Sequence, residues 1–396
     1  MGDDAGYEVE SIVIDRDELL QVLRDLVGIE SVNPFLGGRG SGEGNIARYI
    51  KDYLERVGLE VKTQAVDADR INVIGTVKGT GNGKSILLNG HTDTVNVDEM
   101  SIDPFRPRLK DGRVYGRGVL DMKSGLAAMM VAVKSIMTSG RRMNGDIILA
   151  FVADEEYRSS GTEELVKAYA ADAAIVCEPT NLNIAIAHKG FAWAKVEVHG
   201  KRAHGSLPDS GIDAIVKAGK VLIEIERLGN RLRSERGHPL LGFPSVHASL
   251  ISGGVELSTY PDYCTIELER RTVPGEDRGT FIQELKDIVE RIHSEDDRFT
   301  ADFDVFFYRQ PHEISKDSAI VQSLGRAEQL VLEKEPTYSG VHFWTDAALL
   351  AEAGIPTAVF GPRGEGLHAS NEYVDFDSVV ATAHVLVEAI TDFCHS

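Results

Sequence analysis

The first half of the chain alternates between a helical and a strand-like spacing of its apolar residues. Residues 17–29 and 45–58 place apolar side chains every three to four positions, which is typical of amphipathic helices. Residues 122–137 predict a further, buried helix, and short apolar runs bounded by Gly, Asp or Pro predict strands. These strands cover residues 71–79, 85–91, 146–154 and 173–179. Apolar strands separated by helices predict an α/β fold, with a mostly parallel mixed sheet flanked by helices.

The pattern changes near residue 188, where apolar and polar residues begin to alternate. Strand patterns are found at 191–201, 245–254, 262–273 and 299–308, and helical patterns at 211–228 and 277–295. Their β-α-β-β-α-β order predicts a small α+β, ferredoxin-like sheet with two helices on one face. We therefore predict an inserted domain at 188–310. Alternation of helices and strands returns afterwards, so 1–187 and 311–396 are predicted to form one discontinuous domain.

Composition narrows the classes of function. The 396 residues are 42% hydrophobic and 26% charged, which is ordinary for a globular protein, and the net charge is −20. This acidic excess argues against a nucleic-acid or anionic-membrane partner, and no run of 18 apolar residues predicts a membrane span. Three cysteines without a CxxC spacing favour a reducing cytoplasm. The glycine-rich segment 79–84 lacks the ending of a phosphate-binding loop and is predicted to be a hairpin turn.

Acidic and imidazole residues lie where the predicted strands end. They are His91, Asp93, Asp121, Glu155, Glu156, Glu178 and His368. Ligands of such sheets gather outside the carboxyl ends of the strands, so these residues are expected to meet at one edge. Two imidazoles and three carboxylates would suit two divalent ions that share one bridging ligand. Nitrogen and oxygen donors without thiolates favour Zn²⁺, with Co²⁺ or Mn²⁺ as alternatives.

Each of these residues has a simpler explanation when it is taken alone. His91 and Asp93 form a short H-x-D pattern that is common without a metal, and Asp121 could cap the helix after it. Adjacent carboxylates at 154–156 are tolerated in a solvated loop. The metal hypothesis therefore depends on the whole set.

Several separated motifs resemble the M20 family of dinuclear metallohydrolases over nearly the whole chain. The motifs are GHTDTV, DPF, YGRGVLDMKSG, DEE, CEP, AHGS and a late H-x-x-N-E. The resemblance implies that Asp121 bridges two metals and that Asp93 orients His91. It assigns His91 and Glu178 to one metal, Glu156 and His368 to the other, and the role of general base to Glu155. It also implies a cis peptide bond after Asp121.

The resemblance extends to the inserted domain and to the segment that follows it. His204 in AHGS would stabilise the oxyanion of the tetrahedral intermediate, within one chain or across a homodimer formed through the inserted domain. Arg271 resembles the family arginine that binds the substrate carboxylate. Arg270 is the weaker choice, because strand alternation directs it to the other face. Thr345 and Asp346 belong to a TDA segment that recurs near the substrate in the family.

The sequence therefore predicts a dinuclear metal-dependent amidohydrolase that cleaves N-acyl amino acids. The fuller motifs CEPT, RRTVPGE and HFWTDA favour the branch of acetylornithine deacetylase and succinyl-diaminopimelate desuccinylase. A metallo-dipeptidase or carboxypeptidase of the same family is the alternative, since it would use the same metals. A catalytically silent relative is disfavoured because no ligand or base is missing. Phosphoester hydrolysis is weaker still, because no phosphate-binding cluster is apparent.

Overall fold

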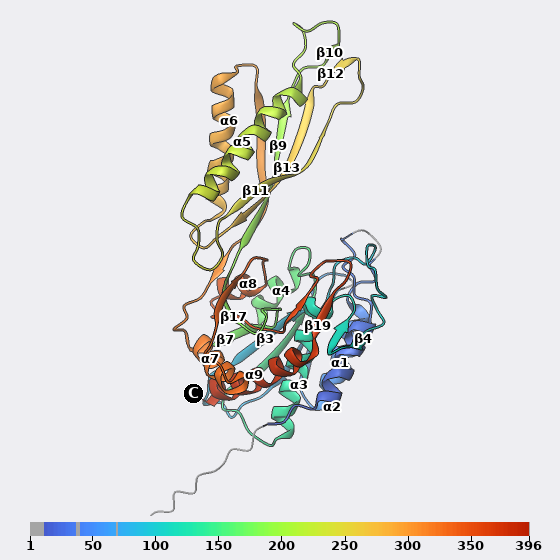
Figure 1. Cartoon of the computed structure of the whole chain (residues 1–396), viewed down its shortest axis with the longest axis vertical. Coiled ribbons are helices and arrows are strands. Elements are labelled where there is room, and N and C mark those ends of the chain that lie inside the picture. Colours follow the sequence, from blue (N-terminus) through green and yellow to red (C-terminus); the bar gives the residue numbers. More distant parts are fainter. Residues whose placement is uncertain (1–11, 37–39, 69, 396) are drawn as a thin grey trace, which may run out of the picture. The chain divides into compact units, whose positions relative to one another are not determined.

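The chain folds into two compact units (Figure 1), and the computed structural model describes residues 12–36, 40–68 and 70–395. The first unit contains the chain up to Ile186, then Ile314–Ser339 and the part from Thr345 onward. The second contains Ala187–Glu313 and Gly340–Trp344. The short piece Gly340–Trp344 lies outside the range expected for an insertion. The indole of Trp344 holds this piece in the second unit, because Trp344 Nε1 donates a hydrogen bond to Gln310 O at 3.1 Å.

A nine-stranded mixed sheet has the order β1-β2-β6-β3-β7-β17-β8-β15, with β16 also paired to β8. Its strands are β1 (Glu60–Ala65), β2 (Ile71–Val77), β3 (Ile86–His91), β6 (Ile147–Val152), β7 (Ala173–Val176), β8 (Ile184–His188), β15 (His312–Glu313), β16 (Tyr338–Val341) and β17 (Thr357–Val359). The central strands β6, β3, β7 and β17 are parallel, whereas β1, β2, β8 and β15 pair antiparallel. The predicted α/β fold class is confirmed, and the parallel centre brings several strand ends to one edge.

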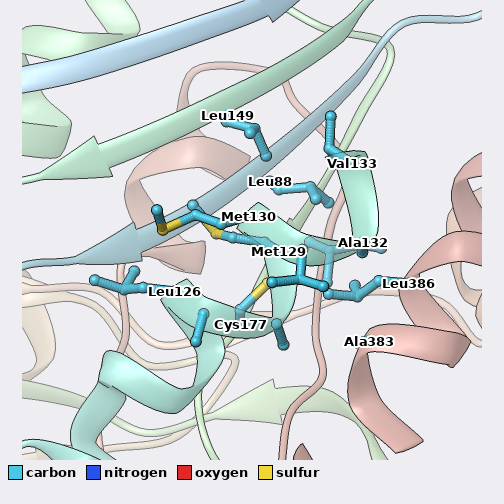
Figure 2. Packing of buried hydrophobic residues seen from close by; sticks show 14 of the residues in the cluster. Leu88, Leu126, Met129, Met130, Ala132, Val133, Leu149, Cys177, Ala383 and Leu386 are labelled. Carbon is cyan, nitrogen blue, oxygen red and sulfur yellow. The ribbon is translucent and has the colours of Figure 1, made fainter. Parts of the chain in front are cut away.

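Helices cover both faces of this sheet. They are α1 (Arg16–Gly28), α2 (Gly44–Val57), α3 (Ser124–Thr138), α4 (Ser160–Ala168), α7 (Ala319–Leu332), α8 (Ala347–Glu352) and α9 (Phe376–His395). On one face α3 lies between the strands and α9, and Met129 and Met130 of α3 belong to a buried cluster that includes Leu88 of β3 and Leu386 of α9 (Figure 2). On the other face α4 and α8 pack on the strands, and Asn89 Nδ2 of β3 donates to Thr162 Oγ1 of α4 at 3.4 Å. In the described part of the chain, no helix is both long and apolar enough to cross a bilayer.

The segment 79–84 is not a hairpin turn. It joins β2 to β3, which are not neighbours, because β6 lies between them in the sheet. A glycine-rich connection can close a tight turn between paired strands, but it can equally run over the surface to a more distant strand. That prediction was wrong because turn chemistry alone does not identify the strand's partner.

A small antiparallel sheet joins two distant parts of the first unit. Its order is β18-β19-β5-β4, formed by β4 (Arg108–Lys110), β5 (Arg113–Tyr115), β18 (Gly364–Glu365) and β19 (Tyr373–Asp375). The loop that contains His368 connects β18 to β19, and Asp121 follows shortly after β5. The cross-strand pair Tyr115–Tyr373 therefore fixes the two segments beside each other.

The second unit has a four-stranded antiparallel sheet in the order β11-β13-β9-β14, with α5 and α6 side by side over one face (Figure 1). Its elements are β9 (Gly190–His199), α5 (Ala214–Ser234), β11 (Ser245–Gly253), β13 (Tyr263–Thr272), α6 (Arg278–Glu295) and β14 (Thr300–Arg309). Alternate residues of β9 and β13 face the helices and are buried, including Val196 and Ile266. A short ribbon pairs β10 (Ala203–His204) with β12 (Thr259–Tyr260).

Gly125 allows the start of α3 to touch the end of β7. A Cβ atom at this position would lie 2.0 Å from the main-chain oxygen of Cys177, and main-chain atoms cannot rotate away. We predict that Gly125→Ala lowers the free energy of unfolding by about 1–3 kcal/mol, the usual range for overpacking a core. Chemical denaturation would measure this loss. Gly44→Ala is the matched control, since nothing lies within 4 Å of the added atom; equal losses in both variants would contradict the prediction.

Candidate metal centre

Six predicted site residues converge at the carboxyl edge of the parallel strands. His91 ends β3, Glu155 and Glu156 follow β6, and Glu178 follows β7. Asp121 lies in the turn before α3, and its peptide bond to Met122 is cis, as the resemblance implies. His368 reaches the site from the loop between β18 and β19.

Asp121 lies between the two imidazoles. Its Oδ1 is 3.1 Å from His91 Nε2, and its Oδ2 is 3.1 Å from His368 Nε2. Glu178 Oε1 completes the first group at 3.3 Å from His91 Nε2, and Glu156 Oε2 completes the second at 3.1 Å from His368 Nε2. Within each group, one ligand atom per residue lies within 4.8 Å of the others. Asp121 thus offers one oxygen to each of two ligand groups.

The chemistry of these groups fits divalent cations. Each group has one imidazole nitrogen and carboxylate oxygens, which are donors suited to Zn²⁺ and similar ions. Glu156 Oε1 is buried and, among the described residues, has no hydrogen-bond partner. Burial and the charge of Asp121 raise the pKa of both Glu156 and Glu178 to about 7. A bound cation would supply the missing partner and favour the charged carboxylates.

Glu155 lies beside both groups and belongs to neither. Its Oε2 is 3.9 Å from His91 Nε2, and its side chain is 10% exposed. Burial raises the pKa of Glu155 well above its usual value, against the opposing effect of His91. A carboxylate that is close to the ligands but not tied to them can accept and return a proton.

Asp93 contacts His91 through its main chain rather than its carboxylate. His91 Nδ1 lies 3.0 Å from Asp93 O, whereas Asp93 Oδ1 is 3.6 Å away. The carboxylate instead accepts hydrogen bonds from the backbone N–H groups of Glu155 and Glu156, each at 3.1 Å, and from Asn33 Nδ2 at 2.8 Å. Asp93 therefore links the orientation of His91 to the position of the 155–156 turn.

Asp154, the first acid of the DEE run, points away from the ligand groups. Its Oδ1 accepts hydrogen bonds from Arg70 Nη1 at 2.6 Å and from Asn33 Nδ2 at 3.0 Å. Sequence reasoning missed both partners. A lone Asn or Arg next to a strand carries no signal that it will reach a loop more than 80 residues away.

Glu372 is a second residue that sequence reasoning missed. Its buried carboxylate accepts hydrogen bonds from the backbone N–H groups of Gly118, Leu120 and Asp121 at 2.8–3.2 Å. It also accepts one from Arg117 Nη1 at 2.9 Å. Since Glu372 is the last residue of the His368 loop, it connects that loop to the turn that carries Asp121. Its place in the H-x-x-N-E motif was the only available signal.

The remaining predicted residues belong to neither ligand group. His204 is exposed in the β10–β12 ribbon, and Arg271 lies on β13, both in the second unit. Arg270 is fully buried and pairs with Glu276 and Glu284, so the predicted orientation of the two arginines is correct. Thr345 and Asp346 are buried in the first unit, where Asp346 Oδ2 accepts a hydrogen bond from Thr162 Oγ1 at 2.7 Å. Their contact with substrate stays a prediction.

The sequence and the fold were compared with those of known proteins. Residues 87–392 match peptidase family M20/M25/M40. The chain is 31% identical to acetylornithine deacetylase from Myxococcus xanthus, over 87% of this chain and 91% of the relative. Its fold is similar to that of aminopeptidase PepT from Bacillus cereus, with a TM-score of 0.79, 22% identity and coverage of 97% and 100%. It is also similar to a dinuclear metal-binding peptidase of the M20 family from Bacillus subtilis, with a TM-score of 0.73, 18% identity and coverage of 95% and 97%.

Replacing Glu372 tests whether it supports the ligands. We predict that Glu372→Gln weakens Zn²⁺ binding about 10–100-fold, because one acceptor oxygen cannot hold the Asp121 turn as two do. The loss of Arg117's charged partner should also lower stability by about 3 kcal/mol. Competition with a chelator would measure the affinity, on protein shown to be folded by circular dichroism. Glu365→Gln, on the exposed β18 strand, is the control; unchanged affinity in Glu372→Gln would refute the supporting role.

Proposed function

Because the chain belongs to peptidase family M20/M25/M40, whose members hydrolyse amide bonds, we propose that it is a dinuclear metal-dependent amidohydrolase acting on N-acyl amino acids. The observation that carries this proposal is the position of Asp121, with one oxygen facing each of two ligand groups. His91 and Glu178 would hold one ion, and Glu156 and His368 the other. Zn²⁺ is the favoured metal, with Co²⁺ or Mn²⁺ as alternatives.

The residues around the ligands are proposed to carry out proton transfer and to position the base. Bound divalent ions would polarise the amide carbonyl and lower the pKa of water. Glu155 would take a proton from the attacking water and deliver it to the departing nitrogen. Its burial supports this role, because a raised pKa lets one carboxyl group both accept and return the proton. Asp93 would keep Glu155 in place through the backbone N–H of that residue.

His204 is proposed to stabilise the oxyanion that forms when the carbonyl is attacked. The backbone N–H of Ser206 donates to His204 Nδ1 at 3.2 Å. A neutral His204 ring that accepts this bond carries its own proton on Nε2, where it can donate to a developing negative charge. Arg271 would bind the substrate carboxylate. Whether His204 serves its own chain or a partner depends on the assembly.

Removal of an acyl group is preferred to peptide cleavage as the reaction. The most informative relative is an acetylornithine deacetylase that matches over most of both chains. A dipeptidase or carboxypeptidase is the second candidate, since the matched family is described as a peptidase family. The same metals and base would serve either reaction. A panel of N-acetyl and N-succinyl amino acids and dipeptides separates the two by their kcat/KM.

A homodimer through the second unit is the proposed assembly. β11 ends the sheet order, and residues 247–253 along it are exposed. Leu250 and Ile251 are 62% and 54% exposed there, and Val216 and Ile223 are exposed on the adjacent α5. Exposed apolar edge strands are usually covered, since they would otherwise pair with the edge strands of other chains and aggregate. A second copy of the chain could cover this edge.

The cytoplasm is the proposed location. Cys177, Cys264 and Cys394 are each buried and unpaired. Burial raises the pKa of the Cys177 thiol, so this group remains protonated and unreactive at neutral pH. Free buried thiols of this kind are typical of proteins that fold in a reducing compartment.

Two matched neutralisations separate the base from the bridging ligand. We predict that Glu155→Gln retains two divalent ions per chain but loses at least about 10³-fold in kcat, since a carboxamide cannot accept the proton of the attacking water. Asp121→Asn should lose both ions, because both ligand groups share this residue. Metal analysis and turnover of N-acetyl amino acids would be measured together. An active Glu155→Gln enzyme, or a chelator-resistant wild type, would contradict the mechanism.

Charge on the β11 edge tests the dimer. We predict that light scattering gives the wild-type protein twice the mass of one chain. The double variant Leu250→Lys/Ile251→Lys should have the mass of a monomer, because its lysines would be buried against those of the second copy. Ile282→Lys, on the exposed side of α6, is the control for added charge. A monomeric wild type at micromolar concentration would overturn the assembly.

A further inference from the structure

The face of the second unit's sheet opposite α5 and α6 carries a cluster of four side chains that includes Arg271. In the strand register Arg271 of β13 is paired with Phe191 of β9, and Glu269 of β13 is paired with Trp193 of β9. The four side chains alternate with buried core residues, so they project from the same face. Cross-strand neighbours are close enough to fix one another's positions.

These side chains form a chain of contacts that ends at the guanidinium. Trp193 Nε1 donates to Glu269 Oε2 at 3.1 Å, and Arg271 Nε donates to Glu269 Oε1 at 2.7 Å. The guanidinium of Arg271 lies over the ring of Phe191, 5.2 Å from its centroid, and the Phe191 and Trp193 rings are 5.4 Å apart. Trp193 thus occupies one oxygen of Glu269 and leaves the other for Arg271.

The arrangement leaves the outer edge of Arg271 available. Its Nη1 and Nη2 groups make no hydrogen bond to the described residues, and the side chain is 33% exposed. Arg270 differs in every respect, because it is buried and hydrogen-bonded through Nε, Nη1 and Nη2. Of these two arginines, Arg271 is the one whose two Nη groups remain available to a carboxylate as a bidentate pair.

We propose that Glu269, itself held by Trp193, is a positioning residue that fixes the plane of Arg271 so that its Nη edge binds the substrate carboxylate. This inference rests on the proposed function, because it takes an N-acyl amino acid as the substrate. Phe191 supports one face of the guanidinium, and Glu269 fixes its rotation by the bond to Nε. A guanidinium fixed in this way loses less conformational freedom when the carboxylate binds.

A role in stability alone would give a different result. The ion pair is partly exposed, with side-chain exposures of 33% for Arg271 and 17% for Glu269. Pairs of this kind contribute little to folding, so removing Glu269 should leave the melting temperature nearly unchanged. An effect limited to carboxylate recognition is therefore separable from a general loss of structure.

The kinetic test uses the zinc-loaded enzyme with N-acetyl amino acids and their carboxamide analogues, which lack the carboxylate. For Glu269→Ala we expect KM for the carboxylate substrates to rise about 10-fold, with kcat within about twofold, and no change for the carboxamides. Glu269→Gln keeps an acceptor oxygen and should recover part of the loss. Trp193→Phe keeps the ring without the N–H and should give a smaller rise in KM. Glu267→Ala is the matched control, two residues along the same strand and face.

The outcomes that overturn the proposal are equally specific. Equal KM values in wild type and Glu269→Ala would overturn it, as would equal KM increases for carboxylates and carboxamides or a parallel loss of thermal stability. The Nε–H resonance of Arg271, observed by ¹⁵N NMR, gives a readout without turnover: we expect slow exchange in wild type and fast exchange in Glu269→Ala. If wild type hydrolyses no N-acyl amino acid, the proposed function fails, whereas an unchanged Nε–H resonance in Glu269→Ala refutes the positioning of Arg271 itself.

Discussion

Burying several carboxylates in one small volume is unfavourable unless cations or hydrogen-bond donors compensate, and Asp121 lies where this cost is concentrated. Its oxygens face two imidazoles at 3.1 Å each, while Glu156 and Glu178 lie on either side. The charge of Asp121 raises the pKa of both glutamates, so the residue that unites the two ligand groups is also a main source of repulsion within them. Two divalent cations would relieve that repulsion. The surrounding fold keeps the groups close enough to need them.

Two further carboxylates hold the ligand groups close together by accepting hydrogen bonds from the backbone. Asp93 accepts the N–H groups of Glu155 and Glu156, and Glu372 accepts those of Gly118, Leu120 and Asp121. Each fixes a whole turn rather than one rotamer. The separation of the ligands is therefore set by main-chain positions on both sides of the site. This explains why a sheet of four short strands is needed behind His368: it holds a loop that the large sheet does not reach.

The sequence was sufficient for the fold class and for the residues at strand ends, because apolar runs and the acids that follow them are local signals. It did not identify Asn33, Arg70 or the full role of Glu372, since their partners lie 60 to 255 residues away. The hairpin expected at 79–84 failed for a related reason, because only the complete sheet shows that β6 separates β2 from β3. Local patterns predict which residues end a strand. They do not predict which backbone groups a side chain will reach across the fold.

The three consecutive acids after β6 show how one turn assigns different tasks to identical chemistry. Asp154 has a positive φ of 69°, which turns the chain so that its carboxylate meets Arg70 and Asn33. Glu156 faces His368, and Glu155 faces the space beside His91 without a direct bond to it. One carboxylate is thus neutralised by an arginine and one belongs to a ligand group. Glu155 remains close to the proposed reaction centre without a direct bond to a ligand, so the direction of the backbone, rather than any property of the side chain, makes it the proposed base.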